Sequence, residues 1–185
     1  MPEDAVNSAE WVTTSVPYLA PRAPGQPDAW SAETAAKGRR GSQRIVQAGE
    51  VAVPGEIAEL LGVAQGDCVV VRRRVMYLDG RPCELTDTYY PPAIAQGTRL
   101  AGTAKIAGGA VTLLAGLGYV GVRAREDITA RLPSEEEAAA LETEASQPVL
   151  QLLRLTLDAK ERPIQADRMV MPAQRQRLRY DVRIG

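Results

Sequence analysis

The chain has 185 residues, of which 45% are hydrophobic, and its formal net charge is −1 at pH 7. This size and composition are typical of one globular domain with its own hydrophobic core. A nearly neutral chain is poorly suited to bind nucleic acid through phosphate contacts alone, because such binding needs a basic surface. No apolar run approaches the roughly 20 residues of a membrane span. No secretory signal is evident at the N-terminus either, so we expect a cytoplasmic protein without a membrane partner.

The residue types that are absent exclude several classes of enzyme. The chain has no histidine and two cysteines, Cys68 and Cys83. It therefore cannot form a Ser-His-Asp triad, a Cys-His pair, a His-ligated zinc site or a four-cysteine zinc site. It also lacks the glycine-rich phosphate-binding motifs GxxxxGK[ST] and GxGxxG. No pair of carboxylates stands out for acid–base catalysis, so we predict a non-catalytic protein without a metal or a cofactor.

Residues 1–28 are predicted to form an extended arm or linker. They show little hydrophobic periodicity. They are interrupted by residues that disfavour regular structure, namely Pro17, Pro21, Pro24, Gly25 and Pro27. A short helix is expected at residues 31–37, starting from Ser31, followed by a strand within residues 38–53. The domain itself is therefore predicted to cover residues 29–185.

The rest of the chain contains one pattern twice, at residues 54–91 and again at residues 133–172. Each copy consists of a proline followed by a short helix, which Pro54 begins in the first copy and Ser134 in the second, then an apolar strand, a turn, and a second strand that ends at a proline. Arg74 of the first copy corresponds to Arg154 of the second, 80 residues later. Two copies are too few for a solenoid. We expect two pseudo-symmetric halves that share one sheet, with a cleft between them.

The first copy also predicts its own strand register. Asp79-Gly80 marks a tight turn, and a register in which paired residue numbers add to 160 places Arg73 opposite Asp87. One face of the hairpin is then apolar and the other polar, as a half-buried antiparallel sheet requires. The apolar face carries Val71, Val75, Tyr77, Cys83, Leu85 and Tyr89. The polar face carries Arg72, Arg74, Met76, Glu84, Thr86 and Thr88.

A loop in the middle of the chain has the features of an anion site. Lys105, Gly108 and Gly109 precede a predicted helix, whose free N–H groups and dipole favour a negative group. The next strand is expected to turn Val122, Ala124, Ile128 and Ala130 inward. A set of basic residues is predicted to converge above the cleft and to bind a carboxylate or a phosphate, namely Arg74, Lys105, Arg123, Arg125 and Arg154. The alternative is that each arginine pairs with an aspartate on a solvated face.

The order of these elements predicts an α+β domain with a mostly antiparallel sheet and short helices. Its segments resemble the UTRA domain, the effector-binding half of HutC-type regulators in the GntR family. The first hairpin of that domain is similar to VVVRRRVMYLDGRPCELTDTYYP, its last two strands to RPIQADRMVMPAQRQRLRYDV, and its opening segment to AWSAETAAKGRRGSQRIV. The resemblance covers about residues 29–184 and is closest to actinobacterial members. It implies a fold similar to that of chorismate lyase.

The resemblance implies a sensor whose cleft binds a small, often anionic metabolite. Trp30 and Ser31 match the opening segment that helps to close the site, and Arg74 matches the first arginine of an Arg-x-Arg strand. Met76 replaces the second arginine. Three further positions also differ from members that bind amino-sugar phosphates, which tend to have glutamate, glutamate and tyrosine where this chain has Thr86, Gln165 and Met171. These differences favour a larger or more hydrophobic effector that carries one acidic group.

The predicted ligand-binding residues are therefore Trp30, Ser31, Arg74, Met76, Thr86, Lys105, Gly108, Gly109, Arg123, Arg125, Gln165 and Met171. The resemblance also implies a homodimer, for which an exposed edge strand is a physical route. It implies contact with operator DNA only through a winged-helix domain, since the irregular residues before the domain cannot hold a helix-turn-helix. Two alternatives stay open: an enzyme of the chorismate-lyase type, and a protein-interaction module that binds no small ligand.

Overall fold

A single antiparallel sheet organises the molecule. The computed structural model describes residues 11–182. The sheet has six strands in the order β2-β3-β4-β7-β6-β5. Their bounds are Gly41–Ala52 for β2, Cys68–Leu78 for β3, Arg81–Tyr90 for β4, Arg123–Arg131 for β5, Val149–Leu157 for β6 and Pro163–Pro172 for β7. The predicted α+β class with a mostly antiparallel sheet is confirmed.

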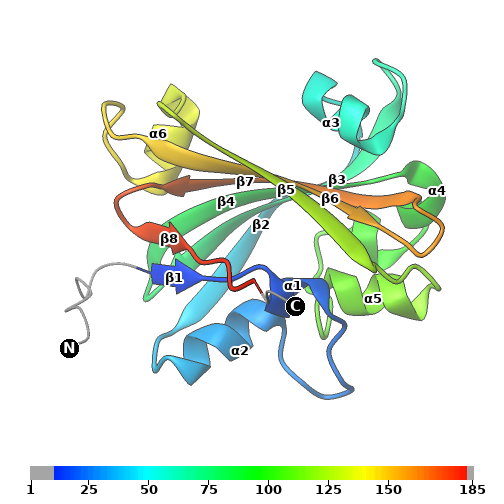
Figure 1. The fold of residues 1–185 in the computed structure, drawn as a ribbon, viewed down its shortest axis with the longest axis horizontal. Helices are drawn as coiled ribbons and strands as arrows, with labels where there is room; N and C mark the ends of the chain where they lie inside the picture. The colour runs from blue at the N-terminus through cyan, green and yellow to red at the C-terminus, as the bar shows by residue number, and fades with distance from the viewer. Residues whose placement is uncertain (1–10, 183–185) are drawn as a thin grey trace.

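Short helices cover both faces of this sheet (Figure 1). In the view of Figure 1, α3 and α6 lie above it, and β1, β8, α1, α2 and α5 lie below it. The remaining bounds are Trp11–Thr13 for β1, Val16–Leu19 for α1, Ala29–Ala36 for α2, Gly55–Leu61 for α3, Pro92–Ala95 for α4, Arg99–Ala101 for the 3-10 helix η1, Ala110–Gly116 for α5, Glu135–Leu141 for α6 and Gln176–Leu178 for β8. Within residues 11–182, no helix is both long and apolar enough to cross a membrane.

The sequence repeat corresponds to a structural repeat. Each copy forms a helix followed by an antiparallel hairpin, α3-β3-β4 in the first and α6-β6-β7 in the second. The two copies meet where β4 pairs antiparallel with β7 at the centre of the sheet. Both helices begin as their sequences predict. Pro54 precedes α3, whereas Ser134 caps α6 through a reciprocal pair of bonds with Glu137.

The predicted register of the first hairpin is confirmed over most of its length, with Arg73 opposite Asp87. A bulge between Met76 and Tyr77 then shifts the pairing, so that Tyr77 lies opposite Pro82. The prediction that Cys83 shares the apolar face is wrong for this reason. Cys83 instead packs with Trp11, Trp30 and Met76 on the opposite face. A one-residue bulge reverses the faces of all the residues beyond it.

The polar face of the hairpin is also buried, and the prediction of a half-buried sheet is therefore wrong. The apolar face packs against α3 and α6 through Val71 and Leu85, respectively. On the other face, Arg72 is only 4% exposed. Its Nη1 donates to the carbonyl of Arg99 at 3.1 Å and its Nη2 to the carbonyl of Ala104 at 3.1 Å. Arg72 thus holds the loop around η1 against the sheet.

The segment predicted as an arm packs on the domain where the structure describes it. Strand β1 pairs in parallel with β8 near the C-terminus. Trp11 is 4% exposed and meets Trp30 edge to face, with 5.4 Å between the ring centroids. Helix α2 begins earlier than predicted, because Asp28 rather than Ser31 caps it by accepting from the backbone N–H of Ser31. Residues 1–10 of the predicted arm lie outside the described part.

Gly41 is expected to tolerate no side chain, because α2 crosses β2 closely there. A Cβ at this position would lie 2.5 Å from Thr34 Oγ1 and 2.7 Å from Trp30 Nε1. Gly41→Ala should therefore lower the free energy of unfolding by about 1–3 kcal/mol in chemical denaturation. The matched control is Gly116→Ala in α5, where an added Cβ meets nothing within 4 Å. It should be neutral or stabilising by up to about 1 kcal/mol. Equal effects of the two substitutions would contradict the close packing.

Candidate ligand-binding site

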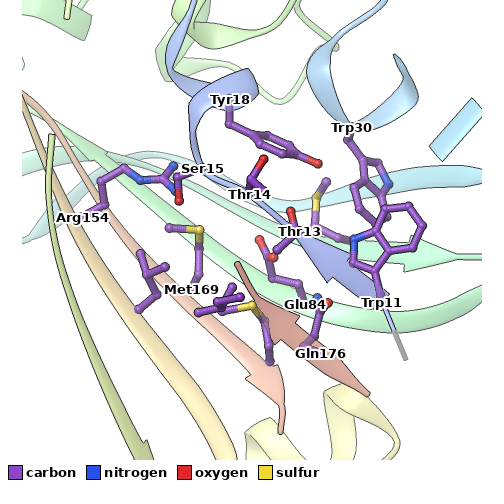
Figure 2. Close-up of a pocket in the computed structure, with 14 residues that line it drawn as sticks. Trp11, Thr13, Thr14, Ser15, Tyr18, Trp30, Glu84, Arg154, Met169 and Gln176 are labelled. Carbon is purple, nitrogen blue, oxygen red and sulfur yellow. The ribbon is translucent and has the colours of Figure 1, made fainter. Parts of the chain in front are cut away.

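A cavity lies between the sheet and the layer formed by β1, α1 and α2, which Figure 1 draws below the sheet. We call the sheet the floor of the cavity and this layer its roof. The cavity has two connected parts that share Tyr18, Trp30, Met76, Arg154 and Met169. We call the part that reaches α5 the outer pocket; its volume is about 120 Å³. The part enclosed by β1 and β8 is the inner chamber, with a volume of about 50 Å³ (Figure 2). A wider groove of about 330 Å³ adjoins the outer pocket at Gln43, Arg74 and Gly109.

The floor of the outer pocket is a row of side chains set by strand register. Arg74 on β3 lies opposite Thr86 on β4, which in turn lies opposite Met169 on β7. Two residues further along β4, Thr88 lies opposite Asp167 of β7. Because successive residues of a strand point to opposite faces, residues two apart share the cavity. The central four strands thus bring both halves of the repeat to one site.

Arg74, like Arg22 of the same pocket, is a cation that no carboxylate neutralises in the described chain. Its Nη2 donates to Thr88 Oγ1 at 2.9 Å, and Thr88 Oγ1 donates to Asp167 Oδ1 at 2.7 Å. Gln165 Nε2 donates to the other oxygen of Asp167 at 2.8 Å. The Nε of Arg74 is buried and has no hydrogen-bond partner. A guanidinium with a donor to spare is suited to bind an anionic group.

Arg154, the equivalent of Arg74 in the repeat, is already neutralised. Its Nε lies 2.6 Å from Glu126 Oε1, and its Nη2 donates to Ser15 Oγ at 2.9 Å. Both side chains of the ion pair are buried, with 8% and 10% exposed. The neighbour of Arg154 on the outer strand is Glu126, whereas the neighbour of Arg74 is Ile45. The two halves therefore differ in whether their arginine is free.

The inner chamber is mostly apolar but contains polar groups without partners. Its walls include Trp11, Leu152, Met169 and Met171, and Glu84 reaches it from β4. Thr86 donates a short hydrogen bond to Glu84. Burial raises the pKa of the Glu84 carboxyl above its ordinary value, although Thr86, Arg74 and Arg154 oppose this. Gln176 Oε1 and Trp11 Nε1 are buried here and have no hydrogen-bond partner.

The roof is joined to the domain by side-chain contacts. The Tyr18 hydroxyl donates a short hydrogen bond to Glu33 on α2. Burial and this carboxylate raise the pKa of Tyr18, which therefore remains a neutral donor. Trp30 Nε1 donates to the carbonyl of Ser42 at 3.2 Å. These contacts, together with the bond from Arg154 to Ser15, hold the segment around α1 over the cavity.

The structure brings most of the predicted ligand-binding residues to this cavity. The outer pocket is lined by Trp30, Arg74, Met76, Thr86, Gly108, Gly109 and Gln165. Met171 lines the inner chamber and Lys105 lines the adjoining groove. Ser31 lies behind the cavity wall, where its N–H and hydroxyl donate to Asp28 at 3.0 and 3.1 Å. Lys105 Nζ is 3.4 Å from the same carboxylate. Burial raises the pKa of Asp28, but Ser31 and Lys105 outweigh it and lower the pKa overall.

The prediction that Arg123 and Arg125 converge on the cleft is wrong. Both lie on β5, the edge strand, and their side chains are 57% and 56% exposed. Arg123 Nη1 is 2.8 Å from Glu161, and Arg125 Nε is 3.9 Å from Asp127. The residues expected to turn inward on this strand include Val122 and Ile128, which are 61% and 40% exposed. Alternation along an edge strand did not identify the buried face.

Several residues of the cavity were not predicted as ligand-binding. The polar face of the first hairpin already grouped Thr88 and Glu84 with Arg74, and that signal was sufficient to find them. The irregular N-terminal segment gave no such signal for its residues. The cavity residues missed include Trp11, Tyr18, Arg22, Asp28, Gln43, Glu84, Thr88, Tyr90, Asp167, Met169 and Gln176.

Comparisons with known proteins agree with the fold. The family model described as "UTRA domain" matches residues 36–177. An uncharacterized HTH-type transcriptional regulator of Streptomyces coelicolor is 31% identical over 138 residues, which are 71% of this chain and 51% of the relative. The chain thus spans about half the length of the curated relative that it matches.

Two solved structures show the same fold. The effector domain of PhnF from Mycobacterium smegmatis has a TM-score of 0.72 and 23% identity, with 86% of this chain and 99% of that chain covered. The C-terminal domain of the histidine utilization repressor from Pseudomonas syringae pv. tomato has a TM-score of 0.62 and 19% identity, with 78% and 100% covered. The curated relative is described as an HTH-type transcriptional regulator rather than an enzyme, which agrees with the predicted non-catalytic role.

Proposed function

The chain belongs to the UTRA domain family of GntR-type transcription regulators, and from this premise we propose that its cavity binds a small-molecule effector with an anionic group. The observation that carries the proposal is that the guanidinium of Arg74 has no counter-charge in the described chain. This guanidinium lines the outer pocket, lacks a carboxylate partner in residues 11–182 and keeps a buried Nε without an acceptor. Burying a cation without an opposite charge is costly, so a bound anion would stabilise it.

The shape and lining of the cavity favour an effector that is compact and partly apolar. The two connected parts have volumes of about 120 and 50 Å³, small beside the roughly 300–1,000 Å³ of a drug-binding pocket. Met76, Met169 and Met171 supply adaptable apolar walls. Lys105 and Gly109 of the predicted loop border the adjoining groove, which gives a longer ligand room to extend.

We propose further that the domain forms a homodimer in the cytoplasm and contacts operator DNA through a separate winged-helix domain. The edge strand β5 supports dimerisation. It has unpaired backbone groups along one side and exposed apolar residues on or next to it, among them Val122, Ile128 and Leu132. Edge strands of this kind readily pair with another chain. Analytical ultracentrifugation of the purified domain measures this directly.

A thermal-shift screen tests the effector site. The panel contains phosphorylated sugars, carboxylic acids and apolar acidic metabolites. A ligand present at 100 times its dissociation constant should stabilise the domain by about 2.7 kcal/mol, a rise of several degrees in Tm. Arg74→Ala should weaken that ligand by roughly 10- to 100-fold, because it removes a charge-assisted hydrogen bond.

Arg123→Ala is the matched control, because Arg123 lies on the exposed side of β5. It should leave the ligand-induced shift unchanged. A shift that survives in Arg74→Ala, or one that disappears equally in both variants, would place the binding site elsewhere. A panel without any shift would favour the interaction module that binds no small ligand.

A further inference from the structure

The inner chamber presents one hydrogen-bond acceptor, on Gln176, that the described chain leaves unsatisfied. Gln176 is 3% exposed, and its Oε1 has no hydrogen-bond donor. Glu84 reaches the same chamber, where the hydroxyl of Thr86 is its hydrogen-bond donor (Figure 2). Buried acceptors normally find a donor, because leaving one unsatisfied costs about 1–3 kcal/mol. A ligand that donates a hydrogen bond would satisfy Gln176 Oε1; Trp11 Nε1, the unpaired donor of the same chamber, does not do so.

The charges around the cavity point to a positively charged donor. Glu84 forms no ion pair within residues 11–182, and neither does Asp167, which is 3% exposed and accepts hydrogen bonds from Thr88 and Gln165. Arg154 is the arginine that lines both parts of the cavity, but Glu126 already neutralises it. Among the described residues, the inner chamber thus holds the unpaired carboxylate of Glu84 and no unpaired guanidinium, whereas the outer pocket holds Asp167 together with Arg74 and Arg22. An anionic ligand alone would leave Glu84 of the inner chamber without a counter-charge.

The walls and size of the chamber suit a small cation. Trp11, Trp30 and Tyr18 line it, and aromatic rings attract ammonium groups. Trp11 already attracts one ammonium group outside the chamber, because Lys37 Nζ lies 3.9 Å from the centroid of the Trp11 ring. A volume of about 50 Å³ holds an amino group and its attached carbon, since a water molecule needs about 10–15 Å³ by this measure.

We propose that the inner chamber binds a protonated amino group of the effector, held by Glu84 and Gln176, while Arg74 binds an anionic group of the same molecule. The effector is then a zwitterion. This inference rests on the proposed function, since it assigns a second group to the same site. Arg74 lies opposite Thr86, so Arg74 and Glu84 are diagonal neighbours with Cβ atoms roughly 7 Å apart. Amine and acid should therefore be separated by several carbons.

Three matched series of probes test the proposal in titrations followed by tryptophan fluorescence and by Tm. The first series consists of the zwitterions 4-aminobutyrate, 5-aminopentanoate and 6-aminohexanoate. The second consists of the acids that lack the amine, and the third of the amines that lack the acid. The best zwitterion should bind at least about tenfold more tightly than its matched acid, the gain expected from one charge-assisted hydrogen bond.

Two variants separate the roles of the charges. In Glu84→Gln, the zwitterion should bind no more tightly than its matched acid, and continued binding of that acid through Arg74 shows that the pocket is folded. In Arg74→Ala, both acid and zwitterion should weaken. Glu161→Gln alters an exposed carboxylate that does not line the cavity. It should leave the affinity for all three series of probes unchanged.

The outcomes distinguish the inference from the proposed function. Acids that bind through Arg74 with no gain from the amine, or a gain that persists in Glu84→Gln, would overturn the zwitterion and leave the anionic effector site intact. A complete lack of response from all three series would overturn the zwitterion, and the thermal-shift panel then decides the anionic effector site by itself.

Discussion

Glu126→Gln is expected to lower the free energy of unfolding by about 3 kcal/mol, because it leaves the buried guanidinium of Arg154 without its counter-charge. Arg154 Nε lies 2.6 Å from Glu126 Oε1, and both side chains are at most 10% exposed. The Tyr180 hydroxyl donates to the other carboxylate oxygen at 2.7 Å and would lose a charged acceptor. For a chain of this size, Tm should fall by roughly 6–12 °C in a calorimetric scan.

The control for this prediction is Glu161→Gln. Its partner Arg123 is 2.8 Å away, but the two side chains are 57% and 63% exposed. Exposed ion pairs contribute little to stability, so Tm should change by about 1 °C or less. Equal effects of the two substitutions would contradict the claim that burial makes the Arg154–Glu126 pair important for stability.

The same ion pair should make stability fall in acid. Burial raises the pKa of Glu126, but Arg154, Ser15 and Tyr180 outweigh it and hold the pKa below its ordinary value of 4.5. A carboxyl with a lowered pKa in the folded state contributes stability above the pKa of the unfolded state. That contribution is lost as the pH falls through the folded pKa. The difference in Tm between the wild type and Glu126→Gln should therefore shrink as the pH falls below 4.5.

Leu61→Ala and Leu141→Ala should each lower the free energy of unfolding by about 2–5 kcal/mol, because each empties a packed site. The two leucines are equivalent in the repeat and close the C-terminal ends of α3 and α6. Leu61 is 5% exposed and Leu141 is fully buried. They belong to separate core clusters, one beneath each helix, so the effects should add in the double variant to within about 0.5 kcal/mol.

Leu132→Ala provides the control for this pair. Leu132 is 62% exposed just after β5, so its replacement should change stability by about 0.5 kcal/mol or less. Denaturant titrations measure all four variants. A large effect from one leucine and a small effect from its counterpart would show that the two halves of the sheet are not packed in the same way.

The sequence was most predictive where local patterns repeat. Two helix–hairpin copies, the Asp79-Gly80 turn and the pairing of Arg73 with Asp87 all follow from short-range signals, and the structure contains each of them. The polar row around Arg74 follows in turn, since register decides which side chains share a face. For this reason Arg74, Met76, Thr86 and Thr88 of the outer pocket were predictable from the first hairpin.

Long-range packing decided what the sequence could not reveal. The bulge after Met76 depends on tertiary context and moved Cys83 to the other face. The parallel pairing of β1 with β8 joins residues more than 160 positions apart, and no local pattern predicts such a contact. The position of β5 at the sheet edge left Arg123 and Arg125 in solvent, because no strand covers that side.

The duplicated architecture offers equivalent arginines, Arg74 and Arg154, to one cavity. Were both free, an elongated ligand would fit equally well in either of two opposite directions. Ile45 beside Arg74 and Glu126 beside Arg154 remove this equivalence. The two ends of the cavity therefore differ in charge, and a bound molecule has one head-to-tail direction. A fold with an internal repeat thus distinguishes the two ends of its ligand through a single carboxylate on an edge strand.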